Sequence, residues 1–492
     1  MTQLNDVQND HRYRLVSSLF VRVLGLIYLI AFASLSTQVE GLAGSNGILP
    51  IAVELQRQAS GDAIGDFIRL PTLFWLNASD PVLLGATIAG CIVSLLIVLQ
   101  LRLRTSLALA FALYLSLYNA CQPFLHFQWD GLLLEAGFLA LWLTPDSRIM
   151  VWLFRWLLFR LRFESGVSKL VSGDSAWPDL TALYTYLEVQ PLPGPFAWYF
   201  HHMPDWLLRT GAGATLFVEI LVPMMMFLPR PWRFAAAWVT ILWQVLIILT
   251  SNHNWFNLLT IALCLFLFDD RALRRVLPST VRRMLAWRPA QPLWPAAVGV
   301  KAHSIAVVLL AALVIVISAA QLRMLVTRTL PGGDIGELVG AMEQYRIVNL
   351  YHVFPTMTKL RIELEILGSI DGKEWKAYHF RYKPDDPARA PRMIIPRQPR
   401  LDWEMWFVPL HPRYLPWFER FLDALLENSP AVTALLEYNP FADAPPNMLR
   451  VEQYRYTFTD RETRDKTGDW WRREYVGPFE PLPGVAREGG GA

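Results

Sequence analysis

Charged residues are scarce in this chain of 492 residues: Asp, Glu, Lys and Arg make up 18% of it, whereas 53% is hydrophobic. Soluble globular proteins carry about 25% charged residues, so the composition indicates a membrane protein. The formal net charge of +3 is small, and the sequence contains no lysine-rich tract. We therefore expect no nucleic-acid partner, and we expect membrane lipid to surround part of the chain.

Cysteine is also scarce, and the usual catalytic signatures do not occur. Cys91, Cys121 and Cys264 each lie inside an apolar run, so they form neither a disulfide framework nor a CxxC metal site. The adjacent His201 and His202 would point about 100° apart on a helix, which does not suit one shared metal. The sequence contains no GxSxG elbow, P-loop, GxGxxG or HExxH. We therefore expect no metal site and no cofactor.

Long apolar runs are abundant. The first, residues 15–35, follows two arginines and is long enough to cross a bilayer, which takes about 20 residues. Ala31 and Ala33 also give this run the small-x-small ending of a cleaved signal peptide. Arg22 interrupts the apolar core that a signal peptide needs, so we expect a retained membrane helix.

Further apolar runs follow the first, at residues 81–101, 105–125, 129–145, 149–171, 206–228, 233–250, 255–269 and 296–322. Together they predict a polytopic α-helical membrane protein with about nine transmembrane helices, in a range of about seven to nine. The expected organisation is a cytoplasmic N-terminal tail (1–14), a multi-pass transmembrane domain (15–322), a soluble non-cytoplasmic C-terminal domain (323–480) and a disordered tail (481–492).

Arginine clusters predict the orientation of these helices. They occur before the first run, at Arg102, at Arg148, at Arg230 and from Arg271 to Arg288. If every run crosses the membrane, all the clusters fall on one side, which the positive-inside rule makes cytoplasmic. The run 149–171 carries several charges, so its alternative is an amphipathic helix lying at the membrane surface.

After the last apolar run the sequence becomes charged and Pro-rich, which is typical of a soluble domain. Residues 359–367 alternate apolar and charged side chains, as a half-buried strand does. A turn at Ser369 to Gly372 and alternating aromatics over 378–382 complete a predicted hairpin. We expect a small β-rich α+β domain whose further elements are a helical region over 416–437 and a strand over 449–458.

Charges at membrane depth form the first candidate site. Glu135 lies deep in an apolar run and needs a buried partner, such as Arg160, Arg162 or Lys169, because an unpaired carboxylate there is costly. Asp130 has a simpler explanation as an acid at a helix N-terminus. We expect a polar network that either fixes helix packing by ion pairs or handles protons, with the members Asp130, Glu135, Arg160, Arg162, Glu164, Lys169 and Glu219.

Lys169 lies near the end of the run 149–171, and two roles are open to it. In an apolar pocket a lysine can lose its proton and act as a base, here with Glu135 or Glu164 nearby to tune it. Near a helix end, a lysine more often extends its ammonium group to the membrane interface. The first role predicts a lipid-accessible cavity around Lys169.

The second candidate site lies in the C-terminal domain, where Pro396 to Phe407 is rich in Trp and Arg. These residue types dominate contact hot spots between proteins. We therefore predict a client-binding site at Arg400, Asp402, Trp403 and Trp406. The alternative is that both tryptophans belong to the core and that Arg400 pairs with Asp402.

An ordered set of motifs covers the chain: GSNGILP (Gly44 to Pro50), FQWDGLLLEAGFLA (Phe127 to Ala140), RFESGVSKLVSGDSAW (Arg162 to Trp177), QPLPGPFAWYFHHMP (Gln190 to Pro204) and PRLDWEMWF (Pro399 to Phe407). This set resembles the lipase maturation factor family, whose animal members lie in the endoplasmic reticulum membrane. The resemblance implies a non-enzymatic maturation factor that helps secreted lipases or other exported proteins to fold and assemble. Short loops, and a C-terminus without a reticulum retention signal, favour a bacterial inner membrane as the alternative location.

A shorter segment, Ser165 to Trp177, resembles the membrane part of vitamin K-dependent carboxylases, in which a lysine at the position of Lys169 serves as a base. In those enzymes another lysine commonly precedes it, where this chain has Ser168. This resemblance implies the alternative function of a membrane enzyme acting on a lipidic or quinone-like substrate. A transporter is a third alternative, although the hydropathy pattern shows no internal repeat.

Overall fold

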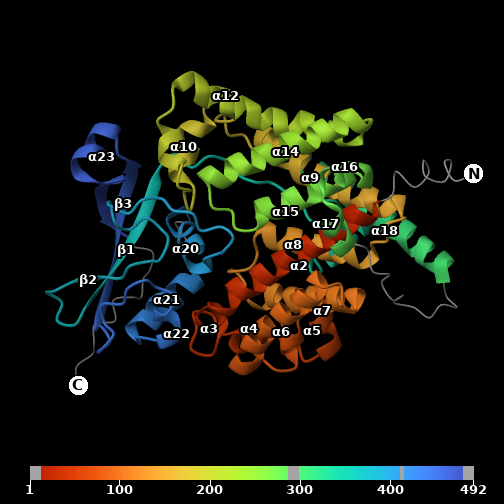
Figure 1. Cartoon of the computed structure of the whole chain (residues 1–492). Helices are drawn as coiled ribbons and strands as arrows, with labels where there is room; N and C mark the ends of the chain where they lie inside the picture. The colour runs from red at the N-terminus through yellow and green to blue at the C-terminus, as the bar shows by residue number, and fades with distance from the viewer. Residues whose placement is uncertain (1–12, 286–298, 411–414, 480–492) are drawn as a thin grey trace, which may run out of the picture.

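The structure is a computed structural model that describes residues 13–285, 299–410 and 415–479. The predicted disordered tail and nearly all of the predicted N-terminal tail lie outside these residues. In Figure 1 the long helices gather on one side of the molecule, and the strands of the C-terminal region lie on the other. The chain thus forms a helical bundle with a small sheet beside it.

Five helices of the described chain are long and apolar enough to cross a membrane. Because an α-helix rises 1.5 Å per residue, each comes close to or exceeds the roughly 30 Å of a hydrocarbon core. They are α2 (Arg14–Ser36), α6 (Asp80–Val98), the helix Asp205–Phe227 that begins with α12 (Asp205–Leu216), α14 (Arg230–Thr250) and α18 (Gly299–Thr327). The structure therefore fits a multi-pass membrane protein.

The predicted count of about nine spans is not confirmed. The other four predicted runs correspond to helices that pack inside the bundle: α7 (Leu103–Ala120), α8 (Gln128–Trp142), α9 (Arg148–Val171) and α15 (Phe256–Leu263). Most residues of α8 are buried, although this helix is only 15 residues long. An apolar run can be buried against protein as well as against lipid, and hydropathy does not separate the two cases.

α2 runs from one end of the bundle to the other. At its first residue, the backbone N–H of Arg14 donates to Asp270 (2.9 Å), and the aspartate before Asp270 pairs with Arg230 (2.8 Å). Two residues after its end, Gln38 donates from Nε2 to the backbone carbonyl of Gln398 in the C-terminal region (2.9 Å). Arginines therefore gather at one end of α2, and the C-terminal region contacts the other. α2 is buried along most of its length.

The C-terminal region contains an antiparallel sheet of four strands in the order β2-β1-β3-β4. The strands are β1 (Arg361–Ser369), β2 (Lys376–Ala377), β3 (Met448–Phe458) and β4 (Trp471–Pro478). The first strand of the predicted hairpin and the strand at 449–458 are confirmed, and β1 pairs with a returning strand. That strand lies at 376–377 and not at the predicted 378–382. β4 has no counterpart in the sequence prediction. The return strand of the hairpin is short because the backbone N–H groups of Phe380 and Tyr382 donate to the carboxylates of Asp385 and Asp402.

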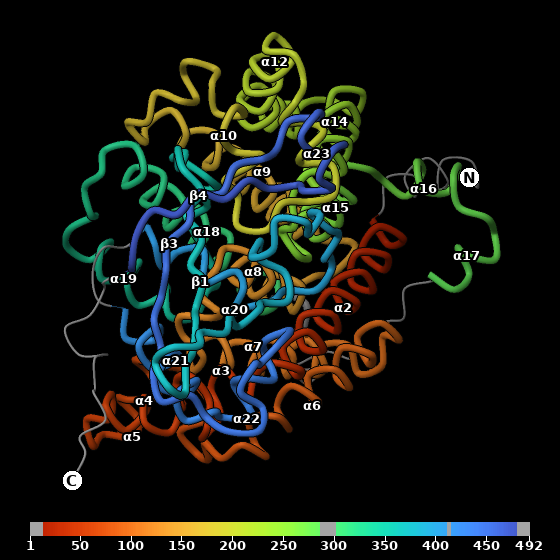
Figure 2. Tube along the Cα trace, turned by 90° about the vertical axis from the view of Figure 1, so that its left-hand side faces the viewer, coloured from red at the N-terminus to blue at the C-terminus, as the bar shows by residue number. Residues whose placement is uncertain are grey.

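The C-terminal region also contains four short helices: α20 (Arg400–Met405), α21 (Pro416–Leu426), α22 (Pro430–Thr433) and α23 (Arg461–Thr467). The helical region predicted over 416–437 is divided into α21 and α22, because Asn428 has a φ of 51° and Pro430 starts a new helix. α22 lies beside α3 (Val39–Ala43) at the lower edge of Figure 2. A Cβ on Gly41 of α3 would lie 2.3 Å from the carbonyl oxygen of Ala431, so this close approach requires glycine.

The other described helices are short: α4 (Ile51–Gln58), α5 (Ala63–Arg69), η1 (Leu73–Trp75), α10 (Ala182–Val189), α11 (Ala197–His201), α13 (Val222–Met224), η3 (Met225–Phe227), η4 (Cys264–Leu267), α16 (Asp270–Val276), α17 (Ser279–Met284), α19 (Gly333–Glu343) and η5 (Val408–Leu410). One hydrophobic core continues from the bundle into the C-terminal region. Phe124 packs on Trp417 with ring centroids 5.8 Å apart, and Trp129 packs on Trp403 at 4.9 Å. The change of composition at residue 323 therefore does not separate two hydrophobic cores.

Candidate functional site: a charged junction inside the bundle

An irregular segment of the C-terminal region, residues 347–357, enters the bundle beside α8 and α9. A buried segment without regular structure needs other partners for its backbone groups. Side chains that the sequence places at membrane depth supply them: Tyr351 donates from its backbone to Glu164 (3.0 Å), and the carbonyl of Val353 accepts from Lys169 (2.7 Å). The charged residues of α9 therefore hold this segment in place.

Glu135 of α8 lies at the centre of the first group of charges and is fully buried. It pairs with Arg160 of α9 through one carboxylate oxygen. The other oxygen accepts from the backbone and the side chain of Asn349 (3.0 and 3.1 Å) and from the hydroxyl of Tyr351 (2.9 Å). Both oxygens thus have partners, which is the condition under which a buried carboxylate is tolerated.

Asp130 pairs with Arg400, which comes 270 residues later in α20. The guanidinium group binds both carboxylate oxygens, at 2.7 and 2.8 Å, and Tyr114 donates its hydroxyl to one of them (2.5 Å). Asp130 lies in the first turn of α8, where the helix dipole also favours a negative charge. A bidentate pair fixes orientation as well as distance, so it anchors α20 on α8.

Glu219 binds two cations of α9. Its carboxylate lies 2.8 Å from Nζ of Lys169 and 3.3 Å from a guanidinium nitrogen of Arg162. Glu219 belongs to a π-helical turn, Phe217–Leu221, that widens its helix just before Pro223, which has no N–H to donate. Turns of this kind are frequent at functional sites.

Lys169 is buried, 2% exposed, so the expectation that it extends to the membrane interface is wrong. Besides Glu219, its ammonium group reaches the backbone carbonyls of Val353 (2.7 Å) and Ser165 (3.3 Å). An ammonium group has three N–H donors, and each has an acceptor here. Glu219 therefore supplies a counter-charge to Lys169, and two backbone carbonyls accept hydrogen bonds from its ammonium group.

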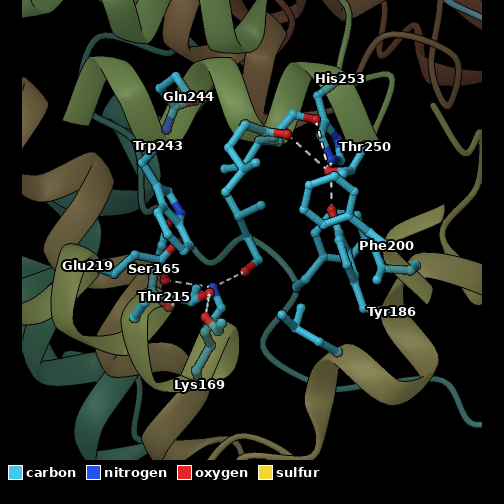
Figure 3. A pocket seen from close by; sticks show the side chains of 18 of the residues that line it. Ser165, Lys169, Tyr186, Phe200, Thr215, Glu219, Trp243, Gln244, Thr250 and His253 are labelled. Carbon is cyan, nitrogen blue, oxygen red and sulfur yellow. Dashed lines mark hydrogen bonds and ion pairs between the residues drawn. The ribbon is translucent and has the colours of Figure 1, made fainter. Parts of the chain in front are cut away.

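A cavity of about 330 Å³ borders Lys169 (Figure 3). Tyr186 and His253 face each other on its other side, with 3.0 Å between the hydroxyl oxygen and Nε2. The enzymatic alternative requires such a cavity, and the structure places Lys169 at its wall, paired with Glu219. Among the described residues, no three His, Cys, Asp or Glu side chains gather into a metal site.

The structure places three of the four predicted client contacts inside the protein. Arg400 is 1% exposed, and Asp402 and Trp403 are 3% exposed. Arg400 pairs with Asp130 and not with Asp402, so the alternative of an internal Arg400–Asp402 pair is also wrong. Local sequence cannot show this partner, because Asp130 belongs to a different part of the chain.

Asp402 has a structural role in the turn after the hairpin. Its carboxylate accepts hydrogen bonds from the backbone N–H groups of Tyr382 (2.7 Å) and Lys383 (3.0 Å). Burial raises the pKa of Asp402 to about 6. Trp406 is half-buried, and its indole N–H donates to the carbonyl of Val189 (2.6 Å).

Sequence reasoning missed the uncharged partners of these charges. Asn349 and Tyr351 complete the group around Glu135, and Tyr114 completes the pair of Asp130 with Arg400. A signal was present, since Asn349 and Tyr351 interrupt the apolar residues Ile347, Val348 and Leu350 a few residues after α19. Uncharged hydrogen-bonding residues carry no hydropathy penalty comparable to that of a charge, so they are easily passed over.

The apolar helices and the buried ion pairs define a multi-pass membrane protein whose C-terminal region is docked on its helices. Residues 15–275 match the lipase maturation factor transmembrane domain, and residues 347–481 match the lipase maturation factor C-terminal domain. The chain therefore belongs to the lipase maturation factor family. The second match begins at the segment that enters the bundle.

Named relatives extend this similarity over nearly the whole chain. Lipase maturation factor 2 of Gallus gallus and of Homo sapiens are each 33% identical to it over 95% of its length, and the matches cover 81% and 82% of those proteins. Lipase maturation factor 1 of Mus musculus is 33% identical over 94% of this chain and 86% of its own. No solved structure matches the chain. None of these findings favours a carboxylase-like enzyme.

Proposed function

We propose that this protein is a membrane-anchored maturation factor that helps a secreted lipase to fold and assemble, without catalysing a reaction of its own. The observation that carries the proposal is the family match, which extends in order over the membrane helices and the C-terminal region. The relatives that match over most of their length are named lipase maturation factors.

The proposed orientation places the N-terminus in the cytoplasm and the C-terminal region in the periplasm or the reticulum lumen. Arg14, Arg230 and Arg233 contact one group of residues at the same end of the bundle, and the positive-inside rule makes that end cytoplasmic. The C-terminal region contacts the opposite end through Gln38 and Asn252. A secreted client would meet the protein on this side.

Labelling of a cysteine tests this orientation. A cysteine placed at Tyr475, which is 59% exposed on β4, should react with a membrane-impermeant maleimide in intact spheroplasts or from the lumenal side of microsomes. A cysteine at Arg102, which lies in an arginine cluster, is the matched control and should react only after permeabilisation. The opposite pattern would overturn the orientation.

The pair of Asp130 with Arg400, and the contacts of the segment 347–357 with α8 and α9, give the C-terminal region a fixed position on the helices. Three of the four predicted client contacts are buried and help to hold α20 inside the protein: Arg400, Asp402 and Trp403. We therefore keep only Trp406, which is half-buried, as a predicted client contact. β4 adds an accessible surface, because it is an edge strand that exposes large apolar side chains. Exposed edge strands of this kind are typical sites of protein contact.

Secretion of an active lipase tests the proposal. In cells that lack this protein, we expect the activity per mass of secreted lipase to fall, and wild-type protein to restore it. Replacing Tyr475 on β4 with Asp should prevent restoration, whereas Lys466→Glu on the exposed α23 should restore activity fully, with equal membrane levels of both variants. Unchanged lipase activity in the cells without the protein would overturn the proposed function.

A further inference from the structure

The cavity beside Lys169 is bordered by helices that can cross a membrane. Its wall is mostly apolar, and α12 and α14 contribute more of its lining residues than any other helices. Both belong to helices long and apolar enough to cross a bilayer. Lining residues on both helices are partly exposed, among them Leu207 and Leu246. The opening therefore lies between two membrane helices, where an apolar chain can enter from the hydrocarbon core.

Two lining side chains keep hydrogen-bond donors without a partner among the described residues. Gln244 is 1% exposed, and its Oε1 accepts from Asn257 (2.7 Å), but its Nε2 has no acceptor. Figure 3 shows this nitrogen pointing toward the cavity. Nε of Arg162, which is also buried, has no acceptor either. Oδ1 of Asn257, which also lines the cavity, has no donor. Because a buried donor without an acceptor is costly, the two unpaired donors indicate a ligand with acceptor atoms.

The charges that line the cavity do not cancel. Arg162 and Lys169 are cations, and Glu219 is the only carboxylate among the described lining residues. His253 adds no charge at pH 7, because burial lowers its pKa to about 4. A positive charge therefore remains, and in surroundings of low dielectric constant it strongly favours an anionic ligand group.

The volume of the cavity matches one short apolar chain. A cavity of about 150 Å³ holds one benzene molecule, with its six carbon atoms. By this scale, the 330 Å³ of the cavity accommodates about a dozen carbon atoms. A phospholipid with two acyl chains is several times larger.

We propose that this cavity binds a single-chain anionic lipid, whose chain lies between α12 and α14 and whose carboxylate or phosphate accepts hydrogen bonds from Gln244 and Arg162. A free fatty acid and a monoacyl phosphate share this chemistry. The site does not depend on the proposed function in lipase maturation, since its test involves no client.

Photolabelling of the full chain in nanodiscs of zwitterionic lipid tests the site. The probe is a twelve-carbon fatty acid with a diazirine at its end, and mass spectrometry locates the labelled peptides. We expect labelling on α12 and α14 that dodecanoate or dodecyl phosphate displaces, while dodecanol displaces it at least about tenfold less well. The better of the two anionic competitors identifies the source of the ligand. Equal competition by dodecanol, or labelling elsewhere only, would overturn the proposal.

Variants separate the site from general effects on folding. Gln244→Glu keeps the acceptor for Asn257 but replaces the free donor with a negative charge, so displacement by dodecanoate should weaken at least about tenfold. Ala214→Phe fills the cavity and should abolish labelling, whereas Leu221→Phe, on the same helix but outside the lining, should not change it. Undiminished labelling in both cavity variants would contradict the proposal, and the competition series with wild-type protein remains decisive if a variant fails to fold.

Discussion

The ion pair between Asp130 and Arg400 allows a quantitative test of how the C-terminal region is held on the bundle. Asp130→Asn keeps the shape of the side chain, but it leaves the guanidinium group of Arg400, 1% exposed, without its counter-charge. Breaking one side of a buried pair costs about 3–5 kcal/mol. Since about 1.4 kcal/mol corresponds to a factor of ten, the undocked population should rise roughly 100- to 4,000-fold.

Limited proteolysis of the full chain in nanodiscs measures this population, because the cleavage rate follows the open fraction when reclosing is fast. We expect Asp130→Asn to accelerate cleavage of the C-terminal region by that factor. The double variant Asp130→Leu with Arg400→Met should return within about tenfold of the wild-type rate, since an apolar pair of similar volume replaces a buried ion pair at little cost.

An exposed ion pair is the matched control. On the surface of α23, Nζ of Lys466 lies 2.6 Å from a carboxylate oxygen of Glu462. Lys466→Met breaks this ion pair and should change the cleavage rate less than about fivefold. If Asp130→Asn is cleaved at the wild-type rate, or if the double variant opens as much as the single one, the pair does not hold the two parts together.

Three further predictions follow from buried groups. Burial raises the pKa of Glu404 to about 8, so the folded chain keeps a proton that the unfolded chain releases above about pH 4.5; the melting temperature should fall from pH 5 to pH 8, and less so in Glu404→Gln. An equal fall of the melting temperature with pH in the wild-type protein and in Glu404→Gln would contradict this. Tyr351→Phe removes a hydrogen bond to Glu135 and should lower the free energy of unfolding by about 1–3 kcal/mol. Denaturant titration measures this change, and an unchanged free energy of unfolding would rule out that hydrogen bond. Glu219→Gln leaves two buried cations unpaired and should lower the melting temperature far more than Glu462→Gln on the surface; similar shifts would refute the role of Glu219.

Local patterns in the sequence predicted the elements that depend on neighbours along the chain. The alternation over 359–367 identifies β1 because side chains of a strand point to opposite faces in turn. The apolar stripe after residue 416 identifies α21 for the same kind of reason, since residues three and four apart share a helix face. The family could also be recognised in this way, because its motifs are short and occur in order.

The sequence by itself determined that this is a membrane protein with a charged C-terminal region, since composition and long apolar runs depend on no contact. Only the tertiary structure decided which runs are buried by protein, as for α8, and which partner each buried charge has. Arg400 and Asp130 are 270 residues apart, and no periodicity links them. The same holds for the cavity, where Gln244 and Arg162 come together from two helices. Packing joins such residues, and packing is a property of the folded chain.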